Sequence, residues 1–380
     1  MSLEKKQSKK GVLMPPAVGY SFQILLSFLF KYKIDSRFVF RFFLTIIVNL
    51  INWPFRTYER LFINPKYKKY ASSESPIFIL GHWRSGTTHL HNLLCKDPQM
   101  GYTTTYQSVF PDTIFNKLGY FLFEGFARAL IPRKRAGDNV NLGTKLPQEE
   151  EFALGDKTPI SFYYFWMFPR NIKLFYKRFI RFEDIDTAVK EEWKANYKLL
   201  ISKSLKNTNT QLYLSKNPTN TGRIDVLLEM FPKAKFIHIH RNPIEVFLST
   251  QNFFKKMLPH LQFQNISLNE IKEDIVHLYK QLMTNYFEQK SLIPKGNLVE
   301  VRFDELEYKP MNVLKHVYSE LNISGFERAE PFIQDYANSM KSYKKNNHVL
   351  SKQQLDILTE AFQFAMTELN YSIPLNLDII

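Results

Sequence analysis

The chain has 380 residues, 44% of them hydrophobic, and this length and apolar content exclude a largely disordered protein. They suit one large α/β domain with additions, or two domains. The single cysteine, Cys95, excludes an intramolecular disulfide and favours a reducing compartment, so we expect the protein in the cytoplasm. The net charge is +15, and residues 1–70 supply +10 of it, with thirteen Lys and Arg against three Asp and Glu.

The basic N-terminal residues include two apolar stretches, 22–30 and 38–53, and two or three helices are expected over residues 20–63. Neither stretch predicts a membrane span, because the first is too short and four polar residues interrupt the second. These are Arg41, Thr45, Asn49 and Asn52. Lys and Arg mixed with aromatic and aliphatic residues suit helices lying at a membrane surface, which would place the protein peripherally at the inner membrane face. A helical layer packed on the main domain fits equally well, since the apolar side of a helix can be covered by lipid or by protein. Nucleic acid is the weakest of the three partners, because no recognised nucleic-acid motif occurs.

An apolar run and a turn with two glycines follow at residues 76–94, and they predict a buried strand, a loop and a helix. In this order, loop N–H groups and the positive end of the helix dipole point at one position, where an anion binds. Gly81 and Gly86 have the spacing of a Walker A loop, but Thr87 occupies the position of its phosphate-binding lysine. The loop offers Arg84 instead, with the hydroxyls of Ser85, Thr87 and Thr88. An ordinary strand-to-helix turn is the alternative.

Elements then alternate along the chain. A short strand is expected over 100–106, a helical and aromatic region over 108–135, and a long helix over 184–205. Further strands are expected at 211–215, 235–240 and 298–303, with helices at 223–231 and 243–257 between them. This alternation predicts a parallel sheet covered by helices on both faces, with ligands outside the carboxyl ends of the strands.

One such strand end carries a second chemical signal. Arg241 stands where the strand 235–240 stops, and Ser249 lies about two turns into the next helix, so both can face the ligand edge. An arginine there can donate two N–H groups to one phosphate. His238 and His240 point the same way along the strand, but we expect hydrogen-bonded histidines rather than a metal site, since no HExxH pattern and no cysteine ligands accompany them.

Segments 81–88 and 240–249 together resemble the sulfotransferase family that uses 3′-phosphoadenosine 5′-phosphosulfate (PAPS). Its first loop reads Pro-Lys/Arg-Ser-Gly-Thr-Thr, and its second motif reads Arg-Asn/Asp-Pro followed by a serine at this distance. Residues 149–154, 216–218 and 301–306 also match a large, mainly bacterial branch of the family. The resemblance implies a P-loop-like central parallel sheet flanked by helices. We expect a helical N-terminal extension over residues 1–70 and a sulfotransferase domain over 71–380, with its motifs within 76–306.

The resemblance also implies roles at the matching positions. Residues 84–88 would hold the 5′-phosphosulfate, with Arg84 where many relatives have a catalytic lysine. Arg241 and Ser249 would hold the 3′-phosphate. The reaction would be an in-line displacement in which charge collects on the leaving phosphate. Arg84, together with Thr88, would stabilise that charge, so no metal is expected.

The acceptor side is less defined by the sequence. Many cytosolic relatives use a histidine in a Lys-x-His-Leu motif that this chain lacks, and other relatives use a glutamate as the base. Glu149 is our first candidate and Glu151 the second, with a solvated helix start as the alternative. Lys216, at a strand end, would contact the sulfonate or the acceptor, or would be a surface lysine.

The sequence therefore predicts a sulfotransferase that moves a sulfonate from PAPS to a hydroxyl, or as second choice an amine, of a small apolar or lipid-like acceptor. The aromatic stretches 108–126 and 161–168 and the basic N-terminal helices favour such an acceptor. Two other classes stay open: a P-loop nucleotide or small-molecule kinase, which would need ATP and Mg²⁺, and a non-catalytic membrane-surface protein. The basic segment 341–348 is a candidate for a loop that closes over the cofactor. The acceptor's identity and the oligomeric state are not predicted.

Overall fold

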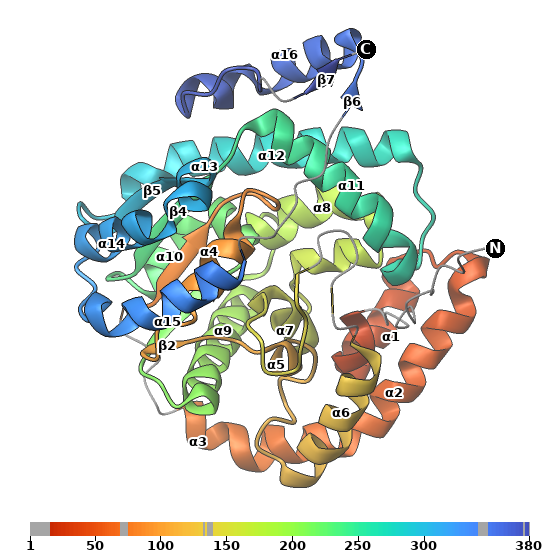
Figure 1. The fold of residues 1–380 in the computed structure, drawn as a ribbon. Coiled ribbons are helices and arrows are strands. Elements are labelled where there is room, and N and C mark those ends of the chain that lie inside the picture. The colour runs from red at the N-terminus through yellow and green to blue at the C-terminus, as the bar shows by residue number, and fades with distance from the viewer. Residues whose placement is uncertain are drawn as a thin grey trace, which may run out of the picture.

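A computed structural model describes residues 16–68, 75–131, 134, 140–340, 349–374 and 377–379. Within these ranges, five parallel strands form a central sheet in the order β2-β3-β1-β4-β5 (Figure 1). The strands are β1 Ile77–Leu80, β2 Met100–Gly101, β3 Leu212–Lys216, β4 Lys235–His240 and β5 Leu298–Arg302. The predicted parallel sheet is confirmed. The expected strand over 100–106 is shortened to β2, because Thr104 caps the next helix by accepting from the N–H of Gln107.

The two faces of the sheet bury alternate residues of each strand. In β1, Ile77 and Ile79 pack with helices on one face, and Phe78 and Leu80 pack into a larger core cluster on the other. The first face is covered by α4 Thr87–Leu94, α14 Pro310–Glu320 and α15 Phe326–Ser339. The larger cluster takes in α9 Thr187–Thr208, α10 Ile224–Met230, α11 Pro243–Leu261, α12 Leu268–Gln289 and α16 Lys352–Glu368. Strands that are apolar at every position are typical of a sheet covered on both faces.

Further helices surround these elements. The helices are α1 Phe22–Lys31, α2 Val39–Tyr58, α3 Asn64–Lys68, α5 Thr105–Val109, α6 Lys117–Leu130, α7 Glu150–Lys157, α8 Ile172–Phe175 and α13 Phe303–Tyr308. A π-helical segment, η3 Glu59–Ile63, joins α2 to α3, and the 3₁₀ segments η4 Phe162–Trp166 and η7 Pro218–Gly222 lie near the sheet. A short parallel pair, β6 Val349–Leu350 and β7 Asp378–Ile379, stands apart from the main sheet (Figure 1).

The register brings four strand ends to one edge of the sheet. Leu80 of β1 pairs with His238 in β4, Lys216 closes β3 beside Ile79, and His240 at the end of β4 pairs with Arg302. The chain segments that follow these strands therefore start from neighbouring points, as expected for a parallel sheet.

The N-terminal helices pack on the domain. Ile24, Leu25 and Phe28 of α1 are buried in the larger core cluster, and the ring of Phe28 lies 4.9 Å from that of Tyr164. Helices α1, α2 and α3 form an outer layer along one side of the molecule (Figure 1). The boundary near residue 70 stays a prediction, because residues 69–74 lie outside the described ranges.

Candidate active site

The loop between β1 and α4 has a conformation that requires glycine at two positions. Gly81 has a φ of 141° and Gly86 a φ of 102°, and L side chains rarely adopt such values. A Cβ on Gly81 would lie 2.3 Å from the carbonyl oxygen of Ile239, and a Cβ on Gly86 would lie 2.3 Å from the Phe303 ring. The two glycines identified from their Walker-like spacing are thus needed for the backbone path itself.

The loop offers an anion mainly its backbone N–H groups. The Ser85 hydroxyl lies 2.8 Å and 3.1 Å from the carbonyl oxygens of His82 and Ile239, so it serves to hold the loop against β4. Gly86 is the N-cap of α4 and has no side chain to accept from the first N–H groups of the helix. A bound phosphate oxygen would accept from them instead. The cofactor roles of Ser85, Thr87 and Thr88 stay predictions.

Substitution of Gly86 tests the loop geometry. Gly86→Ala should lower the free energy of unfolding by about 1–3 kcal/mol, because the new Cβ overlaps Phe303 and the residue must keep its positive φ. Gly125→Ala in α6 is the matched control, since a Cβ there meets nothing within 4 Å. It should be neutral or stabilising by about 0.5–1 kcal/mol. Urea unfolding followed by circular dichroism measures both, and equal stability of the two variants would contradict the loop geometry.

The two motifs predicted to hold the cofactor meet in the structure. Arg84, from the loop, donates from Nε to the Oγ of Ser249 on α11 at 3.1 Å. The guanidinium carbon of Arg241 lies 4.8 Å from the centre of the Phe303 ring. The same ring is the nearest neighbour of a Cβ placed on Gly86. The Phe303 ring therefore contacts Arg241 and also lies next to Gly86 of the loop. Sequence reasoning placed both arginines at this edge but gave Phe303 no role, although it lies within the matching stretch 301–306.

Arg241 is held by a residue of the helix that follows it, α11. Its Nε donates to Oε2 of Glu245 at 3.0 Å, and both side chains are less than one fifth exposed. The pair uses one of the five N–H donors of the guanidinium. The remaining donors have the fork geometry that suits a phosphate.

Glu149 connects the end of β3 with the loop through side-chain contacts. One carboxylate oxygen forms a close ion pair with Nζ of Lys216, and the other accepts a hydrogen bond from the Tyr163 hydroxyl. That hydroxyl in turn accepts a hydrogen bond of 3.0 Å from Nε1 of Trp83. Trp83 precedes Arg84 in the loop. A carboxylate can accept about four hydrogen bonds, so these two leave capacity for a substrate hydroxyl. The Glu149 side chain is 11% exposed, against 0% for Glu151.

Tyr163 and Trp83 are site residues that sequence reasoning did not identify. Burial, and then the charge of Glu149, raises the pKa of Tyr163 well above its usual value, so the phenol keeps its proton and acts as a donor. Trp83 could have been noted from its position beside Arg84. For Tyr163 the sequence carries no spacing signal, because its link to Glu149 arises only from the fold.

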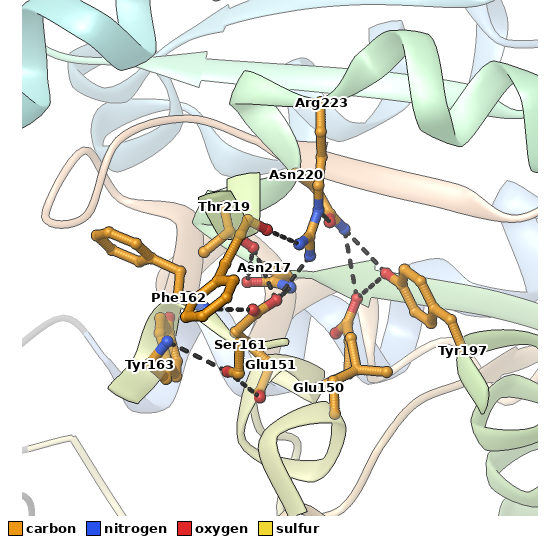
Figure 2. A network of polar contacts seen from close by, with 12 residues as sticks. Glu150, Glu151, Ser161, Phe162, Tyr163, Tyr197, Asn217, Thr219, Asn220 and Arg223 are labelled. Atoms are coloured by element: carbon orange, nitrogen blue, oxygen red, sulfur yellow. Dashed lines mark hydrogen bonds and ion pairs between the residues drawn. The ribbon is translucent and has the colours of Figure 1, made fainter. Parts of the chain in front are cut away.

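Glu151 occupies a different environment from Glu149, and Figure 2 shows the residues that surround it. Its Oε1 accepts from the N–H of Phe162 at 2.9 Å, and its Oε2 accepts from Arg223 Nη2 at 2.6 Å. Asn217 and Thr219 donate to the same Oε2 at 2.8 Å and 3.0 Å. Four donors fill the carboxylate, and neither Glu151 nor Arg223 has exposed side-chain surface. This geometry favours Glu149 over Glu151 as the base, because the Glu151 side chain has no exposed surface, and the role of either residue stays a prediction.

Two structural alternatives from the sequence, a solvated helix start at residues 149–151 and a surface lysine at 216, are wrong. Counted as whole residues, backbone included, Glu149, Glu150 and Glu151 are at most 8% exposed, so they do not form a solvated helix start. Lys216 is 2% exposed and paired with Glu149, so it is not a surface lysine. Its contact with a sulfonate or acceptor stays a prediction.

The aromatic run 161–168 belongs to the core. Its members from Phe162 to Phe168 are at most 4% exposed, and they stack mainly on one another and on α1, α8 and α11. The run itself gives no support for an apolar acceptor, because its rings face protein. Two members contact the site residues directly: Tyr163 bonds Glu149, and the ring of Phe162 lies 5.4 Å from that of Trp83.

Two other predictions concern the histidines of β4 and the basic segment 341–348. His238 is buried, stacks on Tyr286 at 3.7 Å and has its pKa lowered by burial, and His240 contacts the Tyr371 hydroxyl at 3.0 Å. Among the described residues, no three His, Cys, Asp or Glu side chains are grouped to hold a metal ion. The basic segment 341–348 lies outside the described residues.

Comparison with known proteins gives consistent matches. A sequence model described as "Sulfotransferase family" matches residues 76–328. The chain is 29% identical over 352 residues to omega-hydroxy-beta-dihydromenaquinone-9 sulfotransferase Stf3 from Mycobacterium bovis and from Mycobacterium tuberculosis, covering 91% of this chain and 88% of each relative.

Two solved structures share the fold. Sulfotransferase STF1 from Mycobacterium tuberculosis H37Rv aligns with a TM-score of 0.62 at 15% identity, over 89% of this chain and 90% of that one. Sulfotransferase STF9 from Mycobacterium avium aligns with a TM-score of 0.63 at 16% identity, over 94% and 98%.

Proposed function

The chain belongs to the sulfotransferase family, and we propose that it moves the sulfonate of PAPS to the hydroxyl of a lipid-like acceptor without a metal. The observation that carries this proposal is the contact between Arg84 and Ser249, 3.1 Å apart, at the edge where β1, β3 and β4 end. It joins the two segments whose motifs resemble the cofactor-binding motifs of the family.

The residues of the loop and of α11 suit an anionic nucleotide. Arg84 and the N-terminal N–H groups of α4 would face the 5′-phosphosulfate, and Arg241 with Ser249 would face the 3′-phosphate. The loop has threonine in the place of the Walker lysine, which fits a cosubstrate without a γ-phosphate. As the sulfur–oxygen bond to the phosphate breaks, negative charge collects on the phosphate, and Arg84 is positioned to stabilise it.

Glu149 suits the opposite task, removal of the acceptor's proton. The acceptor oxygen would attack sulfur while its proton passes to the carboxylate. Lys216 and Tyr163 each hold one oxygen of that carboxylate, which fixes its orientation. Trp83 donates to Tyr163, so the same loop that faces the cosubstrate also positions the base.

The acceptor class rests on the relatives. The Stf3 proteins are named for an omega-hydroxy dihydromenaquinone, a lipid-like alcohol, and they align over 91% of this chain. Because the identity is 29%, we propose the same class of acceptor for this chain and not the same molecule.

Calorimetry with 3′-phosphoadenosine 5′-phosphate (PAP) in the presence of EDTA tests the cosubstrate. We expect metal-independent binding in the micromolar range, weakened about 10- to 150-fold by Arg84→Ala or by Arg241→Ala, because each removes charge-assisted hydrogen bonds worth about 1.5–3 kcal/mol. Arg328→Ala, an exposed arginine on α15, is the control and should leave binding unchanged. Binding of ATP with Mg²⁺ but not of PAP would favour a kinase, and binding of neither would favour a non-catalytic protein.

A further inference from the structure

Helix α2 is inverted relative to the helices of a water-soluble surface, because it buries polar side chains and exposes apolar ones. The stripe that faces the protein consists of Phe42, Thr45, Asn49, Asn52 and Arg56. Nine large apolar side chains of the same helix are exposed: Val39, Phe40, Phe43, Leu44, Ile47, Leu50, Ile51, Trp53 and Tyr58. A helix packed on a soluble domain normally shows the opposite arrangement.

The buried polar stripe fixes the orientation of the helix. Asn49 Nδ2 donates to the carbonyl oxygen of Ala17 at 2.8 Å, and Arg56 Nη1 donates to that of Gly19 at 2.6 Å. Glu59, in η3, accepts from the backbone N–H groups of residues 114–116 and pairs with Lys203 at 2.8 Å. Rotating the helix to hide its apolar side would turn these polar side chains outward and leave their partners on the domain, such as the carbonyl oxygens of Ala17 and Gly19, buried without these hydrogen bonds. Each neutral group that this leaves unsatisfied costs about 1–3 kcal/mol.

The apolar side continues onto the neighbouring elements. Helix α6 lies beside α2, with the ring of Phe123 5.9 Å from that of Phe55 (Figure 1). We define the apolar face as the exposed apolar residues of α2 given above, together with Leu29, Phe30, Leu61, Phe62, Leu118, Phe121 and Leu122. Several members are more than 60% exposed, with Phe30 at 89% and Phe121 at 76%. An apolar surface of this kind marks an interaction site.

Positive charge lies at both ends of the long helix. Exposed cations precede α2 and follow it: Lys31, Lys33 and Arg37, then Arg60, Lys66 and Lys68. The two acidic residues of the described range 16–68 are neutralised, because Asp35 pairs with Arg170 at 2.7 Å and Glu59 is buried against Lys203. A second copy docked about a two-fold axis would bring these cations against one another. Anionic lipid headgroups would instead neutralise them.

We propose that the apolar face is the membrane-docking surface of this enzyme, and that its ligand is an anionic phospholipid bilayer. The segment Ser36–Lys68 is long and apolar enough to cross a membrane, but the bonds of Asn49, Arg56 and Glu59 to the rest of the protein require it to lie flat in the interface. Trp53 and Tyr58 suit the headgroup level, where aromatic side chains with a polar group are enriched. This inference stands on surface geometry and does not depend on the proposed acceptor.

Tryptophan fluorescence of the full chain gives a direct test. The chain has four tryptophans, and Trp83, Trp166 and Trp193 are at most 5% exposed whereas Trp53 is 58% exposed. With vesicles of phosphatidylglycerol and phosphatidylcholine, we expect a blue shift of the emission and quenching by brominated phospholipid chains. Both changes should disappear in Trp53→Phe and weaken at high salt or with phosphatidylcholine alone.

Paired charge substitutions locate the surface. Ile51→Asp with Phe121→Asp should weaken co-sedimentation with the anionic vesicles at least tenfold. Phe332→Asp with Ile357→Asp is the matched control, because these side chains are 54% and 57% exposed on α15 and α16, and it should bind like the original protein. Thermal melts establish that both variants are folded. Absence of vesicle binding by the original protein, or equal binding by both variants, would overturn the proposal. A dimer in sedimentation velocity that only the first variant dissociates would also overturn it and assign the face to a second copy.

Discussion

Glutamine in place of Glu149 should lower turnover by about two to four powers of ten, the usual contribution of a general base, while PAP affinity stays within about threefold of the original. Glutamine keeps the size of the side chain and its acceptor for Tyr163, but it cannot take a proton from the acceptor hydroxyl. Single-turnover sulfonate transfer from PAPS, with calorimetry of PAP on the same samples, measures the two quantities separately. Near-normal turnover would move the base to another residue.

Tyr163→Phe tests how much the orientation of Glu149 contributes to turnover, apart from its ability to take a proton. This change removes the donor to Glu149 and the acceptor for Trp83, but it keeps the carboxylate. We therefore expect a smaller loss of turnover than for Glu149→Gln, because the carboxylate that takes the proton is still present. Single-turnover sulfonate transfer by the two variants measures the difference, and equal losses would contradict this expectation.

The central sheet and the meeting of Arg84 with Ser249 could be predicted from the sequence. Both residues follow apolar runs that read as strands, and parallel strands bring their carboxyl ends to one edge. The outcome did not depend on exact boundaries, since a shift of one or two residues in a strand end still leaves the following loop at that edge.

The choice between Glu149 and Glu151 could not be predicted in the same way. It depends on where α7 begins: Glu149 is its extended N-cap, with φ −75° and ψ 126°, and Glu150 is the first helical residue. Boundaries of this kind are uncertain by more than one residue from a sequence alone. Three of the four donors to Glu151 come from Asn217, Thr219 and Arg223, more than sixty positions away.

The orientation of α2 could have been predicted from the spacing of its polar residues. Thr45, Asn49, Asn52 and Arg56 recur at intervals of four, three and four residues, which places them on one stripe of a helix. Three of them, Thr45, Asn49 and Asn52, also argue with Arg41 against a membrane span. A polar stripe on an otherwise apolar helix also predicts that the stripe faces protein, because buried polar groups need fixed partners and lipid supplies none.

Glu151→Gln should destabilise the fold by about 3–5 kcal/mol, which is the cost of leaving one partner of a buried ion pair without its counter-charge. Arg223 has no exposed side-chain surface and lies over the ring of Trp193 at 4.7 Å, so water cannot replace the lost carboxylate. Urea unfolding followed by circular dichroism measures the change. Glu368→Gln, in the partly exposed pair with Lys290 at 3.0 Å, is the control and should cost no more than about 1 kcal/mol.

A double variant separates charge from shape in this buried pair. Adding Arg223→Met to Glu151→Gln removes the remaining charge, and the pair should then recover part of the lost stability, because replacing both members of a buried ion pair by neutral groups is often nearly neutral. Recovery will be incomplete, since Arg223 also donates to Asn220 at 2.9 Å. A Glu151→Gln protein that unfolds at the original urea concentration yet transfers no sulfonate would contradict this account and restore Glu151 as a candidate base.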